Sequence, residues 1–268
     1  MKRMLLLGML FSLFSLTLVA QNPSVLLENI SVIDVKSGKV EVQSVLVKGE
    51  KIKSIRSKIS APKDAQIIDG TGKFLIPGLV DAHIHLFQSG GIFARPDALD
   101  LRKYKPYEEE VEWVLGEAGD FLKRYLRCGI TTVMDVGGPM SNYDLRTEFS
   151  DHTAYPNLYL TGPLISTYQP AALNVKDPPI IQVASPEEAR EQVRKQLPSK
   201  PDFIKIWYIS TGAMPADSTY DMVAATIDES HKHGLKVAVH ATELRTAKLA
   251  LKAGADFLVH SVEDEVAD

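Results

Sequence analysis

Apolar and polar residues alternate along residues 25–59, and turn signals at residues 37–38 and 48–50 interrupt the alternation. Successive side chains of a β-strand point to opposite faces, so this pattern indicates strands with one covered face. Runs of this kind separated by glycine-containing turns are typical of hairpins. The pattern predicts a small antiparallel β-unit, which residues 66–73 extend by another strand and turn.

The rhythm changes after residue 79, where short apolar runs alternate with amphipathic segments. The apolar runs predict strands at residues 79–86, 130–136, 157–166, 203–209, 236–241 and 256–262. The segments between them predict helices at residues 107–129, 141–149, 185–197, 218–234 and 242–254, the third with Ser185 as N-cap and Glu188 at the capping-box position. Strands that alternate with helices build parallel sheets covered on both faces. We expect an α/β fold, an incomplete (β/α)₈ (TIM-type) barrel that lacks two strand–helix units.

The first strand of this series is unusual because it carries polar side chains inside an apolar run. The stretch "FLIPGLVDAHIHLF" places Asp81, His83 and His85 at alternate positions, which share one face of a strand. In a parallel barrel the C-terminal ends of the strands surround the active site. Imidazole is a preferred ligand of Zn²⁺ and related metals, so the pair of histidines predicts a metal site. Two histidines satisfied within the core are the alternative.

Later strands carry further candidate ligands. His240 ends the strand "KVAVH", and His260 lies in "FLVH". By contrast, His231 and His233 precede Gly234 at the end of a predicted helix, where a histidine is favourably placed against the helix dipole. His152 lies in a polar loop. The predicted metal ligands are therefore the histidines in or at the ends of strands.

Lys205 lies within the apolar strand "FIKIWY". A buried ammonium group is costly, so a lysine there favours the neutral amine. A neutral amine reacts with CO₂ to give a carbamate, an anion whose two oxygens are able to bridge two metal ions. The alternative is a lysine at the strand end whose ammonium group reaches water.

The N-terminus and the composition limit the setting in which this chemistry operates. Lys2 and Arg3 precede 17 uncharged residues that end at Ala20, as in a secretory signal peptide, with an uncleaved membrane anchor as the alternative. We expect an exported protein, periplasmic or secreted, without stable membrane association after cleavage. A net charge of −4 and the absence of a basic block argue against nucleic acid as a partner. The single cysteine, Cys128, excludes an intramolecular disulfide.

Five segments together resemble the amidohydrolase superfamily, specifically amidohydrolase family 1. "PGLVDAHIH" is similar to the PG-x-x-D-x-H-x-H entry to the first barrel strand of that family. "GITTVMDVGG", "DFIKIW", "LKVAVHA" and "GADFLVHSVEDEV" resemble the segments that follow in the family. Within it, the chain looks most like exported prolidase-like and imidazolonepropionase-like proteins. After the signal peptide at residues 1–20, the resemblance implies the N-terminal part of a composite β-sandwich at residues 21–76 and a barrel at residues 77–268.

The resemblance also implies the roles of the candidate residues. His83 and His85 would bind the more buried of two divalent metal ions, with zinc expected. Carbamylated Lys205 would bridge the two ions, and His240 and His260 would bind the second. Asp81 matches the acidic position of the motif and would support the strand end or lie directly at the metal, without being assigned as a ligand. The implied reaction is the hydrolysis of a carbon–nitrogen bond in a small-molecule substrate, an amide, a cyclic amide or a dipeptide, by a metal-activated water.

One residue of the family pattern has no match. The family takes its catalytic Asp from barrel strand eight, whereas this chain ends after predicted strand six, and Asp256, Asp264 and Asp268 do not match that position. No catalytic residue is therefore assigned, and we expect a chain truncated before strands seven and eight. A non-catalytic fragment or weak metal-binding protein is one alternative. A mononuclear deaminase is another, although Lys205 argues against it. The sequence leaves the oligomeric state open, and Tyr208, Thr211 and residues 162–170 are candidates for the pocket lining or for plain loop structure.

Overall fold

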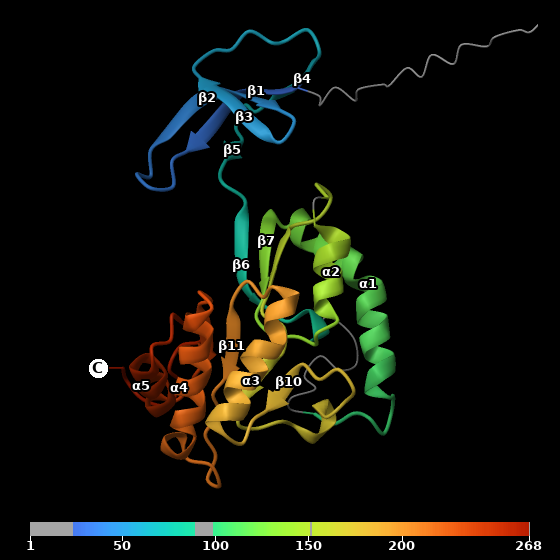
Figure 1. Ribbon diagram of the computed structural model, residues 1–268. Helices are drawn as coiled ribbons and strands as arrows, with labels where there is room; N and C mark the ends of the chain where they lie inside the picture. The colour runs from blue at the N-terminus through green and yellow to red at the C-terminus, as the bar shows by residue number, and fades with distance from the viewer. Residues whose placement is uncertain (1–23, 89–98, 151, 268) are drawn as a thin grey trace, which may run out of the picture. The chain divides into compact units, whose positions relative to one another are not determined.

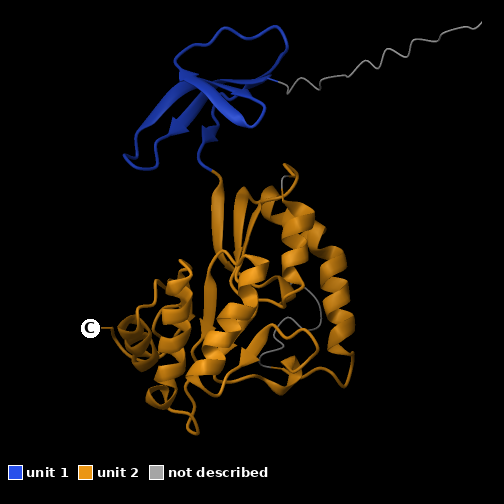
Figure 2. Cartoon of the chain, viewed as in Figure 1, with its two compact units in different colours: residues 1–77 blue, residues 78–268 orange. Residues whose placement is uncertain are grey.

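A computed structural model describes residues 24–88, 99–150 and 152–267 of the 268-residue chain. The chain divides into two compact units, residues 1–77 and 78–268, which Figure 2 shows in different colours. The predicted signal peptide, residues 1–20, lies outside the described residues. Within the described ranges, no helix is both long and apolar enough to cross a membrane.

Unit 1 is a small β-sheet in which the predicted hairpins form. Its strands are β1 (Ser24–Ile33), β2 (Val40–Lys48), β3 (Lys51–Arg56), β4 (Ala65–Asp69) and β5 (Phe74–Leu75). The antiparallel order β3-β2-β1 is completed by β4 and β5, which both run parallel to β1. Gly38 and Gly49 adopt positive φ in the two hairpin turns, at 73° and 58°, a conformation that glycine reaches without a steric cost.

Unit 2 contains parallel strands that alternate with helices (Figure 1). The strands are β6 (Leu79–Ile84), β7 (Ile130–Asp135), β8 (Asn157–Leu160), β9 (Leu164–Ser166), β10 (Ile180–Gln182), β11 (Ile204–Trp207), β12 (Val237–His240) and β13 (Phe257–Leu258). They form two parallel sheets, with the orders β6-β7-β8 and β10-β9-β11-β12-β13. This confirms the predicted α/β class, whereas the incomplete barrel remains a prediction.

The helices of unit 2 lie close to their predicted positions. They are α1 (Tyr107–Arg127), α2 (Asn142–Phe149), α3 (Pro186–Gln196), α4 (Ala216–Lys232) and α5 (Leu244–Ala253), with short 3₁₀ turns at Leu86–Gln88, Ala171–Leu173 and Leu197–Ser199. At the start of α3 the Ser185 hydroxyl accepts a hydrogen bond from the Glu188 N–H at 3.2 Å, as predicted. The Glu188 carboxylate in turn accepts from the Ala184 N–H, one residue before the cap, at 2.8 Å.

The run at residues 157–166 forms two strands and not the single strand predicted. Residues 161–163 interrupt the run, and Gly162 there has φ 68°. The chain turns here close to Tyr143, and a side chain at Gly162 would overlap the Tyr143 ring and hydroxyl. The turn separates β8, which pairs with β7, from β9, which pairs with β10 and β11. Strand β10 was not predicted.

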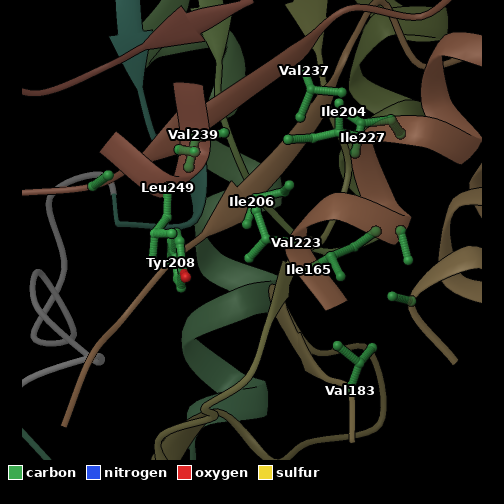
Figure 3. Packing of buried hydrophobic residues seen from close by; sticks show 14 of the residues in the cluster. Ile165, Val183, Ile204, Ile206, Tyr208, Val223, Ile227, Val237, Val239 and Leu249 are labelled. Carbon is green, nitrogen blue, oxygen red and sulfur yellow. The ribbon is translucent and has the colours of Figure 1, made fainter. Parts of the chain in front are cut away.

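A large apolar cluster fixes β11 and β12 against the helices (Figure 3). Ile204 and Ile206 of β11 and Val237 and Val239 of β12 are at most 2% exposed and belong to this cluster. Residues of α3, α4 and α5 supply the other side. Apolar burial of this kind is the main stabilising contribution to a fold. It also sets which face of each strand is turned toward the helices.

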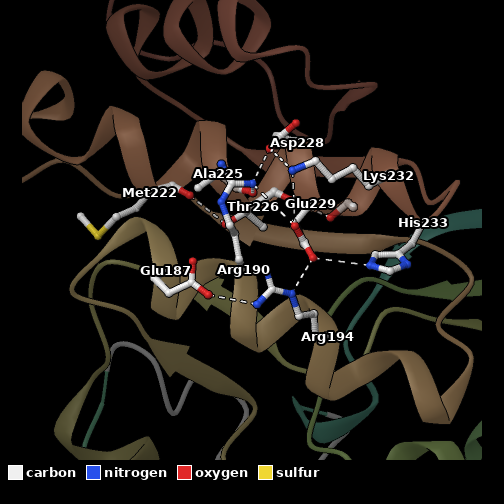
Figure 4. Close-up of polar contacts among 11 residues, drawn as sticks. Glu187, Arg190, Arg194, Met222, Ala225, Thr226, Asp228, Glu229, Lys232 and His233 are labelled. Carbon is white, nitrogen blue, oxygen red and sulfur yellow. Dashed lines mark hydrogen bonds and ion pairs between the residues drawn. The ribbon is translucent and has the colours of Figure 1, made fainter.

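Ion pairs between α3 and α4 accompany this packing (Figure 4). The nearly buried Glu229 carboxylate on α4 accepts a hydrogen bond from Arg194 Nε at 2.6 Å, and Arg190 lies 3.7 Å from the same carboxylate. The guanidinium of Arg194 lowers the pKa of Glu229 below its ordinary value. The ion pairs therefore link the two helices through charged forms of both side chains.

The first predicted strand is less buried than its sequence suggests. Leu79 and Val80 are 48% and 54% exposed, and Phe74 and Ile76 in the preceding segment are exposed as well. Among the described residues β6 pairs only with β7, so one edge of the strand has no neighbour. The expectation of a strand covered on both faces is therefore wrong for Leu79 and Val80, and burial begins at Ile84.

We predict that Ile206→Ala lowers the free energy of unfolding by about 2–5 kcal/mol, because it leaves a cavity in the cluster. Leu251→Ala on α5 is the control, since Leu251 is 56% exposed, and a change within about 0.5 kcal/mol is expected. Urea denaturation monitored by circular dichroism measures both losses. Equal losses in the two variants would show that this cluster does not dominate stability.

Candidate functional site

All five predicted metal ligands lie at one pocket of unit 2. His83 is near the end of β6, His85 follows that strand, Lys205 is in β11, His240 ends β12 and His260 lies two residues beyond β13. Their side chains line a pocket of about 490 Å³. Strands that are distant in the sequence thus bring four imidazoles and one amine together at their C-terminal ends, where sites of parallel α/β folds form.

The two-residue period of the strands explains why Lys205 and His240 point into this pocket. Ile204 and Ile206 face the helices, so Lys205 between them faces the other way, as does Trp207. In β12 the same alternation turns His240 away from the helices. Lys205 pairs in register with Ala238 and Trp207 with His240, which places both polar side chains on one wall.

The rings of His83 and His85 are fixed by backbone carbonyls. His83 Nδ1 lies 3.3 Å from the Val259 carbonyl oxygen, and His85 Nδ1 lies 2.9 Å from that of Gly137. Because a carbonyl oxygen only accepts, each Nδ1 is the N–H donor, and each neutral ring keeps its lone pair on Nε2. The two Nε2 atoms face each other at 3.3 Å. Two lone pairs at that distance are compatible with a cation held between them.

The remaining histidines extend the same cluster. The ring centroid of His260 lies 4.7 Å from that of His83 and 4.4 Å from that of His240. The His260 ring therefore lies close both to His83 of β6 and to His240 of β12. The sequence predicted His240 and His260 as candidate ligands, and the fold places their rings next to each other.

Burial keeps these groups uncharged. It lowers the pKa of His83 to about 4 and that of His240 to about 3, with repulsion from Lys205 as the second cause in both. The pKa of His260 is lowered for the same two reasons. Lys205 is 1% exposed, and its burial lowers its pKa to about 7. Near neutral pH His83, His240 and His260 are therefore neutral, the form that binds a metal, and a large fraction of Lys205 is neutral amine.

The donor set fits a divalent metal ion of the zinc type. Two nitrogens bound to one ion at about 2.0–2.1 Å in a tetrahedron stand about 3.3–3.4 Å apart, which matches the Nε2 separation of His83 and His85. No group of three or more His, Cys, Asp or Glu side chains in the described ranges is already set at metal-binding spacing. The pocket thus offers one preset pair, and the other donors would have to turn toward an ion.

Two aspartates support the strand ends that carry the histidines. Asp81 accepts a hydrogen bond from the His83 backbone N–H at 3.3 Å, so its carboxylate supports the strand end. Asp135, which the sequence did not single out, is 1% exposed at the end of β7. Its carboxylate accepts from Asn142 Nδ2 at 2.6 Å, and burial raises its pKa to about 7. The sequence signal that could have identified Asp135 is its position as a charged residue at the end of an apolar strand.

The rest of the pocket wall is mixed in character. Apolar contacts come from Phe87, Leu164, Ile180 and Trp207, and polar ones from Gln88, Thr242 and Glu263. Of the candidates for this wall, Leu164 from residues 162–170 lies in it. Tyr208 does not, because its hydroxyl donates to the Ala216 carbonyl at 2.6 Å within the core. Thr211 bridges to Met214 in a turn.

The other polar candidates lie away from the pocket. His231 bonds Asp256 at 2.9 Å, and His233 lies 3.5 Å from Glu229, both at the end of α4 as expected. Asp264 accepts from the Leu244 N–H at the start of α5. Asp268 lies outside the described residues. These contacts account for the side chains without a role in the site.

The chain is similar in sequence or fold to several known proteins. The chain is 24% identical to an enamidase from Eubacterium barkeri over 210 residues. The aligned region covers 77% of this chain and 46% of the enamidase. Over 65 residues it is 46% identical to a dihydroorotase from Streptococcus thermophilus, covering 24% of this chain and 15% of that enzyme. The structure of a putative prolidase from Bifidobacterium longum superposes with a TM-score of 0.66 at 24% identity, over 91% of this chain and 56% of that one.

These likenesses carry different weight. The chain spans about half the length of the enamidase and the prolidase, and only a small part of the dihydroorotase. The likeness to the prolidase structure establishes the fold. The model of the amidohydrolase family matches residues 74–268, which include every histidine of the pocket and Lys205. The chain therefore belongs to the amidohydrolase family.

Proposed function

We propose that this chain carries the metal centre of a hydrolase that cleaves a carbon–nitrogen bond in a small molecule, an amide, a cyclic amide or a dipeptide. The facing Nε2 atoms of His83 and His85 are the observation that carries the proposal. Membership of the amidohydrolase family and the likeness to proteins named as a prolidase and an enamidase support it. We also propose, from residues 1–20, that the protein acts outside the cytoplasm.

In this proposal His83 and His85 would hold one divalent ion, zinc by the choice of nitrogen ligands, and His240 and His260 would hold a second. When bound, such ions lower the pKa of a coordinated water, so that hydroxide is available near neutral pH. The chain's own residues prepare that site. The Val259 and Gly137 carbonyls hold the Nδ1 protons of His83 and His85, and Leu164, Ile180 and Trp207 limit the water in the pocket.

As a carbamate, Lys205 would supply oxygen ligands to the two ions. Its neutral amine nitrogen attacks the carbon of CO₂, a new N–C bond forms, one C=O π bond opens and the nitrogen loses a proton to water. The product is a carbamate with one negative charge and two oxygen ligands. Burial supports this step because it raises the fraction of neutral amine at pH 7. A mononuclear deaminase, the second candidate, would not need this lysine.

We predict that the chain binds up to two zinc ions and that His83→Ala/His85→Ala loses at least one of them, because the preset pair of nitrogens is removed. Elemental analysis after gel filtration measures the content. His231→Ala/His233→Ala removes two histidines of the same spacing from the end of α4, outside the pocket, and should keep the wild-type content. Unchanged metal in a folded His83→Ala/His85→Ala variant would refute the site.

We predict that ¹³C-labelled bicarbonate gives the wild-type chain with zinc a carbamate signal in ¹³C NMR, and that Lys205→Ala lacks the signal and holds about one ion fewer. Lys195→Ala is the control, because the Lys195 side chain is 58% exposed on α3. A signal that persists in Lys205→Ala would place the carbamate elsewhere. Unchanged metal content in Lys205→Ala would favour the mononuclear alternative.

We predict a characteristic pH dependence for the metal-free chain in CO₂-free buffer. The pKa of Lys205 falls from 10.5 to about 7 on folding, so below pH 7 the folded state bears the full cost of a buried ammonium group. Between pH 7 and 10.5 only the unfolded state binds the proton, so stability rises with pH. Lys205→Met should therefore stabilise the chain most below pH 7, and the gain should shrink toward pH 10.5 in urea denaturation. A gain that does not change with pH would contradict the lowered pKa.

A further inference from the structure

Asp135 is a buried carboxylate surrounded by neutral donors. It ends β7, where it pairs in register with Ile84 of β6, and it is 1% exposed. Its carboxylate accepts hydrogen bonds from Asn142 Nδ2 at 2.6 Å, from the Leu86 N–H at 3.4 Å and from the Gly137 N–H. None of the ion pairs formed among the described residues includes Asp135. A buried carboxylate without a cation is costly, so apolar packing alone does not explain it.

The backbone that follows Asp135 is held in a tight turn. A side chain at Gly137, which has φ 145°, would overlap Leu164, and one at Gly138 would overlap the Asn142 amide. The Gly138 N–H donates to the Gly162 carbonyl at 3.2 Å. Only glycine allows this close approach, so the positions of the Gly137 N–H and carbonyl are tightly set.

Asp135 and His85 meet through this turn. Gly137 donates its N–H to the Asp135 carboxylate and accepts at its carbonyl from His85 Nδ1, at 2.9 Å. The Leu86 N–H, which also reaches the carboxylate, belongs to the residue directly after His85. The Asp135 carboxylate therefore holds the backbone N–H of Leu86, directly after His85, and that of Gly137, whose carbonyl accepts from the His85 ring. An asparagine would offer one acceptor oxygen in place of two.

We propose that Asp135, with Asn142 as its donor, is a positioning residue that fixes the ring orientation and the Nδ1–H tautomer of His85. The proposal rests on the metal-binding function proposed for His85. It assigns Asp135 no contact with substrate or metal, because its action passes through Gly137 and Leu86. Groups that orient a metal-bound histidine in this way change metal affinity by about 10–100-fold when they are altered.

The test compares Asp135→Asn with Asp177→Asn. Asp177 is a matched control because its carboxylate also accepts two backbone N–H groups, of Met140 and Ser141, at 2.9 and 3.0 Å, without a link to His85. Zinc affinity is measured by competition with a chromophoric chelator. The His85 tautomer is measured in the metal-free chains by ¹⁵N NMR of the ring nitrogens, assigned with His85→Gln. A residue with only a structural role would lower stability without moving the tautomer.

We expect wild-type His85 to carry its proton on Nδ1, and Asp135→Asn to lose that preference and bind zinc about 10–100-fold more weakly. Asp177→Asn should leave both readouts unchanged. An unchanged tautomer and affinity in Asp135→Asn overturn the proposal. If Asp135→Asn does not fold, a wild-type His85 with its proton on Nε2 overturns it as well. Absence of zinc binding by the wild type would instead refute the proposed function, and the tautomer would still decide the role of Asp135.

Discussion

The packing of Ile204, Ile206, Val237 and Val239 against the helices is the constraint on which the site depends. A strand has two faces, and once the branched apolar side chains are buried on one of them, the residues between them must occupy the other. Lys205 and His240 are those residues. The burial of the apolar cluster that stabilises the fold also offsets the unfavourable free energy of burying the Lys205 amine and the His240 imidazole.

Burial in turn gives the pocket its chemistry. It lowers the pKa values of His83, His240 and His260, so these rings are neutral at pH 7, the form of imidazole that binds a metal. The carbonyls of Val259 and Gly137 then decide which nitrogen of His83 and His85 carries the proton. Two lone pairs facing each other at 3.3 Å are the product of these separate constraints. These facing lone pairs favour a bound metal ion.

Much of the fold and of the candidate site was predictable from local patterns in the sequence. The spacing of His83 and His85, the hairpins of unit 1 and the capped start of α3 are encoded within a few residues each, so the sequence alone indicated them. Other features depend on contacts between distant segments. Leu79 and Val80 are exposed on β6, which pairs with one strand among the described residues, and β8 and β9 are separated at Gly162, which has positive φ and lies close to Tyr143. Asp135, Trp207 and Glu263 were missed because no single segment reveals which side chains a turn or strand end brings to a pocket.

The most direct test of the proposed metal centre is a crystal structure of the zinc-loaded chain with anomalous diffraction at the zinc edge. The proposal predicts an anomalous peak about 2.0–2.1 Å from Nε2 of both His83 and His85, with their Nδ1 atoms still on the Val259 and Gly137 carbonyls. A zinc peak at the surface pair His231 and His233, with none in the pocket, would contradict the account.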